Sequence, residues 1–172
     1  MLVVHLHQDK VKIMFKEMES EGPKLDINEL SKLEKEIGIE FPLDYKEFLM
    51  EFNGGEPIER AIDFESIKLH KQGDYVATFY EVSNDVSYGI LPNMVNHGRD
   101  LPVGLIYIAS TPSGNYFLLS LREDSFGKIF YKDHEICGTR EFDYDRGILP
   151  KNIELISESF GELLSRLYDP DE

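Results

Sequence analysis

The sequence predicts an α+β protein, a single domain in which helices pack mainly on one face of a central, mainly antiparallel sheet of about six strands. The first third of the chain shows helical periodicity, and its middle contains short segments rich in β-branched and aromatic residues. Another helical pattern follows near the C-terminal end. Helices on either side of a block of strands favour segregated layers over alternating βαβ units.

Residues 1–24 are predicted to form an N-terminal helical extension and residues 25–172 one globular unit. Within the extension, apolar residues recur at helical spacing from about Asp9 to Glu19, and Gly22-Pro23 then breaks the pattern. No repeat, low-complexity tract or long Ser/Gly linker divides the chain, and its 172 residues are an ordinary size for one domain.

A second helix is expected to begin at Asp26, which suits the N-cap position, with Glu29 three residues later as in a capping box. Gly38 provides the stop, because glycine readily adopts the left-handed conformation that ends many helices. The apolar face of this helix consists of Ile27, Leu30, Leu33 and Ile37.

The segment Ile39–Gly55 predicts a third helix with both of its ends marked. Pro42 suits the first turn because it has no backbone donor to leave unpaired, and Asp44 lies favourably near the positive helix end. Asn53-Gly54-Gly55 tolerates the backbone conformation of a helix C-terminus. A single apolar stripe runs along this helix and consists of Tyr45, Phe48, Leu49 and Phe52.

After the third helix the period changes to that of strands. Two strands are expected at Arg60–Leu69 and Tyr75–Val82, with a turn at Gly73-Asp74 between them. Residues 83–100 have no clean period and predict an irregular excursion with room for a short helix. Loops of this length frequently carry binding sites.

An antiparallel meander and a last helix complete the expected fold. Pro112–Asn115 and Glu123–Gly127 supply the turns of the meander. Ser159 with Glu162 suggests another capping box, followed by an apolar helix face. The strands of the meander are Gly104–Ala109, Tyr116–Leu121 and Lys128–Lys132.

The charge balance is strongly acidic, with 33 acidic against 18 basic residues and a formal net charge of -15. A protein that binds phosphate backbones needs clustered Lys and Arg, and the most basic short segment, Lys68–Lys71, holds only two lysines. We therefore expect no nucleic-acid partner. Two interpretations of the acidity remain open, namely solubility and a surface that receives a cationic partner.

The sequence also predicts no membrane span and a cytoplasmic location. No segment reaches the ~18 apolar residues of a spanning helix, and the N-terminal residues lack the order of charged, apolar and cleavage regions that a signal peptide needs. Cys137 is the single cysteine, so no internal disulfide can form, which is compatible with a reducing compartment. The sequence leaves the oligomeric state open.

His134 lies between Asp133 and Glu135, where a carboxylate could tune an imidazole for acid–base chemistry. Side chains alternate across a strand, however, so His134 would point away from both neighbours. A structural hydrogen bond at a strand end or a contact with a partner is favoured over catalysis. His5-x-His7 lacks an identifiable third ligand, so it predicts no metal site.

Asp143-x-Asp145 resembles a fragment of a metal loop, but the full twelve-residue calcium pattern is missing and a solvated loop is favoured. Cys137 has no identifiable His and Asn partners that would make it a nucleophile. The glycines do not form a phosphate-binding loop. The sequence therefore predicts a binding module without cofactor, metal or catalytic residues.

Several blocks of the chain together resemble the SMI1/KNR4 family, also called the SUKH superfamily, from about Ile27 to about Leu167. The strongest block is FPLDYKEFLMEFNGG, from Phe41 to Gly55, and the next is GKIFYKDHE, from Gly127 to Glu135. The resemblance implies an SMI1/KNR4-like fold. Bacterial members of this family are commonly immunity proteins that bind and block a toxin domain, and fungal members are linked to regulation of cell-wall synthesis.

The resemblance leads us to expect an immunity protein that neutralises a cognate, cationic toxin domain, which would include a nuclease, by occlusion. The alternative is a non-catalytic regulatory or scaffold domain of the same family. The motif residues Tyr45, Phe48, Asn53 and Gly54 are expected to carry the fold, and loops to carry the partner. Charge and loop position select ten candidate partner-binding residues: Glu81, Asp85, Tyr88, Asp100, Asp124, Asp133, His134, Glu135, Asp143 and Asp145.

Overall fold

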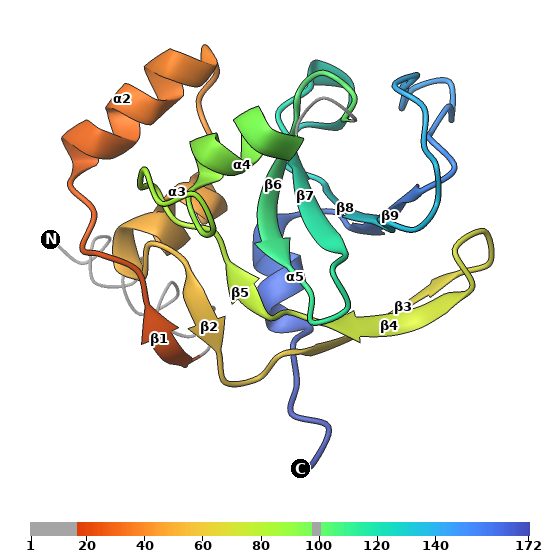
Figure 1. Ribbon diagram of the computed structural model, residues 1–172, viewed down its shortest axis with the longest axis horizontal. Helices are drawn as coiled ribbons and strands as arrows, with labels where there is room; N and C mark the ends of the chain where they lie inside the picture. Colours follow the sequence, from red (N-terminus) through yellow and green to blue (C-terminus); the bar gives the residue numbers. More distant parts are fainter. Residues whose placement is uncertain (1–16, 98–100) are drawn as a thin grey trace, which may run out of the picture.

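The computed structural model describes residues 17–97 and 101–172, which fold into one mainly antiparallel sheet, a small second sheet and four α-helices (Figure 1). This arrangement confirms the predicted α+β class. In chain order the elements are β1 Met18–Glu21, α2 Ile27–Ile37, α3 Leu43–Glu51, β2 Gly55–Pro57, β3 Ala61–Ser66, β4 Lys71–Tyr75, β5 Thr78–Phe79, α4 Ile90–His97, β6 Leu105–Ser110, β7 Tyr116–Ser120, the 3₁₀ turn η2 Glu123–Ser125, β8 Ile129–Lys132, β9 Ile153–Ser157 and α5 Phe160–Ser165.

The large sheet has seven strands in the order β1-β2-β5-β6-β7-β8-β9, and every neighbouring pair is antiparallel. The chain leaves this sheet after β2 to build the separate β3–β4 hairpin and then returns at β5. The three strands predicted for the meander correspond to β6, β7 and β8, in the predicted order and pairing.

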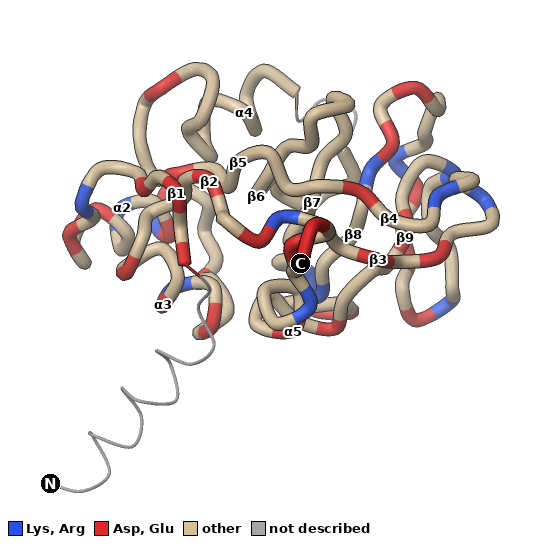
Figure 2. The backbone as a smooth tube through the Cα atoms, turned by 90° about the horizontal axis from the view of Figure 1, so that it is seen from below, with Lys and Arg blue, Asp and Glu red and all other residues tan. Residues whose placement is uncertain are grey.

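Helices α3 and α5 lie on one face of the large sheet and α4 lies on the other (Figures 1 and 2). On the first face, Phe48 of α3 packs against Phe79 of β5 and Phe160 of α5, with ring centroids 5.1 and 4.9 Å apart. On the second face, Tyr107 of β6 donates a hydrogen bond to the carbonyl of His97 in α4. Because both faces are covered, β6 and β8 consist almost entirely of buried residues.

The capped helices form where the sequence places them. The Asp26 carboxylate accepts from the backbone N–H of Asn28, Glu29 closes the capping box, and Gly38 ends α2 in the left-handed conformation. In α3, Tyr45, Phe48 and Leu49 are buried, and Phe52 is half-buried at the C-cap. For α5 only half of the capping box forms, because the Glu162 carboxylate accepts from the N–H of Glu158, one residue before the Ser159 N-cap.

The helix predicted up to Glu19 is wrong at its C-terminal end. Met18–Glu21 is strand β1, which pairs with β2, and residues 9–16 of the expected helix lie outside the described residues. The backbone N–H groups of these residues find partners in the sheet, and this long-range pairing overrides the local helical spacing of Met18.

The turn predicted at Gly73-Asp74 is also wrong, because both residues lie inside β4. The hairpin turns at residues 67–70, where His70 has a φ of 54°. The backbone of Gly73 passes close to the carbonyl of Ile62, since a Cβ at this position would lie 2.6 Å from that oxygen. Glycine is therefore needed here for a close approach of two strands, and not for a turn.

Candidate functional site

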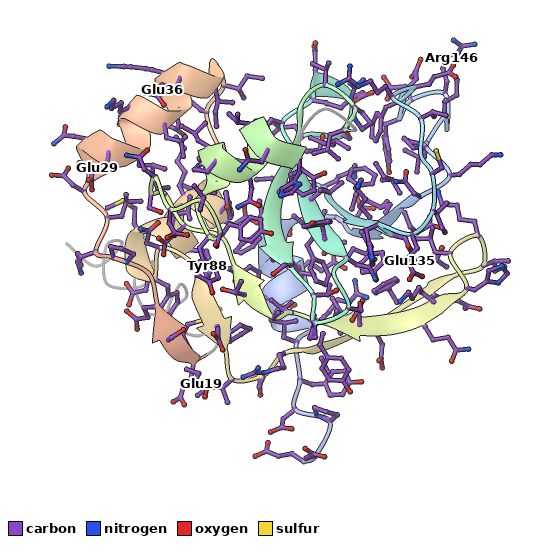
Figure 3. All side chains as sticks on the ribbon, in the orientation of Figure 1. Glu19, Glu29, Glu36, Tyr88, Glu135 and Arg146 are labelled. Carbon is purple, nitrogen blue, oxygen red and sulfur yellow. The ribbon has the colours of Figure 1, made fainter. Side chains whose placement is uncertain are left out.

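The candidate partner-binding residues fall into two groups at opposite ends of the molecule. Glu81, Asp85 and Tyr88 lie in the 81–89 loop between β5 and α4, whereas Asp133 to Asp145 follow β8 (Figure 1). Figure 3 shows Tyr88 and Glu135 well apart, Tyr88 toward the β5 side of the large sheet and Glu135 toward the β8 and β9 side. Asp124 in η2 lies beside the second group, and Asp100 lies outside the described residues. The structure therefore does not gather the nine described candidates into one surface.

The 81–89 loop is shaped by its own hydrogen bonds. The Asp85 carboxylate oxygen Oδ1 accepts from the backbone N–H groups of Ser87 and Tyr88, at 2.8 and 2.9 Å. The N–H of Glu81 donates to the carbonyl of Tyr88, which closes the loop at its base. Asp85 thus folds the loop, and the closed loop leaves the side chains of Val86 and Tyr88 exposed.

Asn53 fixes this loop against the start of α2. Its amide nitrogen Nδ2 donates to the carbonyl of Pro23, and its Oδ1 accepts from the N–H of Val82, both at 2.8 Å. Asn53 is buried and has a φ of 49°, a backbone conformation that asparagine tolerates better than most residues. The family motif residue after α3 therefore joins the segment before α2 to the 81–89 loop.

A small groove, the α2 groove, separates α2 from the 81–89 loop. It has a volume of about 160 Å³, and carboxylates of α2 stand at its edge, among them Glu29 and Glu36 (Figure 3). Its walls are Glu29, Lys32, Leu33, Glu36, Val82, Ser83, Asn84 and Leu91. Sequence reasoning missed the contribution of α2, although Glu29, Lys32 and Glu36 repeat at helical spacing on a face beside its apolar stripe.

The negative charge is concentrated at the end of the molecule that contains this groove. Residues 17–59 hold thirteen acidic and four basic residues, a formal charge of -9 out of -15 for the whole chain. Figure 2 shows acidic positions along β1, β2, α2 and α3, while basic positions recur around the β3–β4 hairpin and β9. We call the surface of β1, α2, α3 and β2 the acidic end.

Asp124 is held in an internal network. Its carboxylate accepts from Nε and Nη2 of Arg122, at 2.9 and 3.0 Å, and from the backbone N–H of Tyr144. The hydrogen bonds from Arg122, supported by Tyr144 and Ser125, lower the pKa of Asp124 to about 2. Since both carboxylate oxygens are used in this way, Asp124 joins η2 to the 142–144 segment.

The residues that follow β8 are also tied to the fold. Asp133 is buried, its N–H donates to the carbonyl of Asn152, and its Oδ1 accepts from the N–H of Glu135. His134 is exposed, and its Nδ1 lies 2.8 Å from Oδ1 of Asn115, which confirms the predicted structural hydrogen bond at the strand end. Glu135 itself is exposed.

Asp143 and Asp145 belong to a tight turn. The backbone of Asp143 pairs with that of Ile148, and its Oδ1 accepts from the N–H of Arg146. Asp145 is exposed. Within residues 17–97 and 101–172, no group of three His, Cys, Asp or Glu residues is placed to hold a metal ion. The pair His5 and His7 lies outside the described residues.

Comparison with known proteins agrees with these motifs. The model of the SMI1 / KNR4 family (SUKH-1) matches residues 24–166. The chain belongs to the SMI1/KNR4 family. Among curated proteins, this SMI1/KNR4 protein is similar to the SPbeta prophage-derived uncharacterized protein YokK of Bacillus subtilis (strain 168), with 28% identity over 163 residues, 86% of this chain and 77% of the relative. None of the described helices of the SMI1/KNR4 chain is long and apolar enough to cross a membrane.

Proposed function

We propose that this SMI1/KNR4 protein is an immunity protein that binds a cognate bacterial toxin domain and blocks it by occlusion. The observation that carries the proposal is the concentration of charge, -9 within residues 17–59, in a family whose bacterial members are commonly immunity proteins. A similar protein derived from a prophage is consistent with a role in conflict between bacteria.

The acidic end is the surface that we propose for this contact. Carboxylates there would occupy the basic cleft of a cationic toxin domain, where substrate phosphates would otherwise bind, and would speed the encounter by long-range attraction. Beside them, Val86 and Tyr88 of the 81–89 loop offer exposed apolar area, and aromatic residues are enriched at protein interfaces. Glu36 of α2 borders the α2 groove, and Tyr88 belongs to the 81–89 loop, whose residues Val82, Ser83 and Asn84 form the opposite wall.

The proposal is of a non-catalytic protein. The His134 ring is hydrogen-bonded to the Asn115 side chain, and not to a serine or cysteine that it could activate. Cys137 is exposed, and its sulfur lies 4.0 Å from the carbonyl oxygen of Gly138, its neighbour in the chain. These contacts favour a structural role for His134, and they place a carbonyl oxygen and not a base beside the Cys137 sulfur.

Co-expression tests this function. The toxin domain encoded beside the gene should kill a bacterial host when expressed alone, and this chain should restore growth. Replacing Glu36 and Tyr88 together, by Gln and Ala, should reduce protection, because Glu36 borders the α2 groove and Tyr88 is exposed on the loop that forms its other wall. The matched control is Glu65→Gln in β3, which removes one exposed carboxylate far from the acidic end. Full killing in the presence of folded wild-type chain would reject the immunity role and leave the regulatory alternative.

A further inference from the structure

A second surface, which the acidic end does not include, combines exposed apolar residues with a hollow. The hollow has a volume of about 590 Å³ and lies between the α2–α3 connection, the segment before β6 and η2. Its lining is Ile39, Val103, Gly104, Leu121, Arg122, Glu123, Asp124 and Asp145. Val103 is 87% exposed and Ile39 is 41% exposed. We call this surface the η2 hollow.

Two more exposed apolar side chains belong to segments that follow lining residues of the η2 hollow in the chain. The backbone at Gly127 packs on Pro42, since a Cβ at Gly127 would lie 3.6 Å from Cγ of Pro42. Their chain neighbours Phe126 and Leu43 are 48% and 65% exposed. Single exposed apolar residues are ordinary, but Val103 and Ile39 line the same hollow, and grouped exposed apolar residues are typical of contact surfaces.

The net charge of the described residues that line the η2 hollow is negative, because their one cation, Arg122, pairs with Asp124 and leaves Glu123 and Asp145. The guanidinium of Arg122 bonds both oxygens of Asp124, donates to the carbonyls of Val103 and Phe142, and stacks over the Phe142 ring. This cation is therefore occupied within the fold. Glu123 and Asp145, by contrast, make no hydrogen bond or ion pair with another side chain among residues 17–97 and 101–172.

We propose that the η2 hollow docks a segment of a protein partner in which apolar side chains alternate with Lys or Arg. Val103 and Ile39 would receive the apolar side chains, and Glu123 with Asp145 would pair with the basic ones. The proposal rests on the proposed function in one respect, because it takes the cognate toxin domain as this partner. It adds a contact that depends on apolar burial to the electrostatic contact of the acidic end.

Calorimetric titration of the purified toxin domain tests this contact. Val103→Ser and Ile39→Ser should each weaken binding at least about tenfold, as expected for well-buried interface residues. The matched control is Ile67→Ser, since Ile67 is 83% exposed at the tip of the β3–β4 hairpin, away from the η2 hollow. Tight wild-type binding that both hollow variants retain would overturn this inference and leave the immunity role intact.

A titration without the toxin separates the two proposals further. A synthetic peptide of alternating Leu and Lys is added to ¹⁵N-labelled chain, with a peptide of alternating Leu and Glu as control. The Lys peptide should shift the amide signals of Val103, Gly104 and Glu123, and the Glu peptide should not. This result would support the η2 hollow even if the toxin domain does not bind. Shifts confined to α2 and the 81–89 loop, or equal shifts with both peptides, would overturn it.

Discussion

The hydroxyl of Tyr131 donates a hydrogen bond of 2.5 Å to Oδ2 of Asp74, and this bond joins the two sheets of the molecule. Tyr131 lies in β8 of the large sheet and Asp74 in β4 of the hairpin. The ring of Tyr131 also packs against Phe64 of β3, with centroids 4.8 Å apart. A buried tyrosine thus holds the hairpin both by its ring and by its hydroxyl.

Tyr131→Phe should lower the free energy of unfolding by about 1.5 to 3 kcal/mol, because the lost hydrogen bond has a charged acceptor. Burial, and then Asp74, raise the pKa of Tyr131 above its ordinary value of 10.0. The unfolded state therefore releases this proton first, so the stability that Tyr131 contributes is complete below pH ~10 and declines as the pH rises further. Denaturant unfolding from pH 8 to 11.5 measures both effects.

The variant should show a shallower alkaline decline than the wild type. The decline should not vanish, because burial also raises the pKa of Tyr80 to about 12 and that of Tyr45. Tyr88→Phe, which changes an exposed tyrosine, is the control and should leave the curve unchanged. Parallel wild-type and Tyr131→Phe curves would show that the hydroxyl does not hold the hairpin.

Tyr45 and Phe48 should respond in opposite ways to truncation. The Tyr45 hydroxyl is buried without a hydrogen-bond partner among the described residues, so Tyr45→Phe should leave stability unchanged or raise it slightly. Phe48→Ala removes a ring that packs on Phe79 and Phe160 and should cost about 3 to 5 kcal/mol. Thermal unfolding of the two variants provides the comparison, and an unchanged midpoint for Phe48→Ala would contradict its place in the core.

Asp124→Asn should weaken the link between η2 and the 142–144 segment and make the protein less stable by about 1 to 3 kcal/mol at neutral pH. The pKa of Asp124 is about 2 in the folded state, below its ordinary value of 3.8. Its contribution is therefore present above pH ~4 and lost as the pH falls toward 2. Asp145→Asn, at an exposed carboxylate nearby, is the control. Equal acid unfolding of wild type and Asp124→Asn would refute the structural role.

Local patterns predicted those parts of the fold that local interactions decide. The capping box of Asp26 and Glu29 and the stop at Gly38 depend on residues within one helix, and they form as expected. β1, β2 and β9 were not predicted, because each is defined by its pairing with a strand far along the chain. The turn of the β3–β4 hairpin was predicted at the wrong place because glycine occurs both in turns and where two strands approach closely. Gly73 is of the second kind.

The sequence predicted the candidate site less well than it predicted the fold. Acidity and loop position selected Asp124 and Asp133, but both side chains are engaged in hydrogen bonds within the fold. Sequence reasoning also counted the charge of the whole chain and did not notice that residues 17–59 hold most of it. Only the packing of α2 against the 81–89 loop places Glu36 beside a groove.

His134→Ala and Cys137→Ser should leave protection against the toxin largely intact, provided that both variants fold. His134 is exposed and its ring contacts Asn115, while Cys137 is exposed and its sulfur lies near the carbonyl of its chain neighbour Gly138. Growth of the co-expressing host, with circular dichroism to confirm folding, gives the result. A catalytic activity of the purified protein that disappears with either change would contradict the binding-module interpretation.

The acidic end should govern how fast the partner associates. Attraction between oppositely charged surfaces raises association rates above the ~10⁵ to 10⁶ M⁻¹s⁻¹ of unsteered protein pairs at low salt. Raising the ionic strength from 0.01 M to 0.15 M shortens the screening length from ~30 to ~8 Å, so distant carboxylates lose their effect and association slows. Dissociation should change less, because close contacts persist in the complex.

Surface plasmon resonance across a salt series measures this dependence. Replacing Glu36 and Glu51, exposed residues of α2 and α3, by Gln should reduce the salt dependence of the association rate. The control removes the same number of charges elsewhere, at Glu65 and Asp169, and should preserve most of it, since neither residue lies at the acidic end. If the two pairs of substitutions had equal effects, the total charge and not its placement would steer the partner. An association rate indifferent to salt would mean that the acidity serves solubility and that apolar contacts hold the complex.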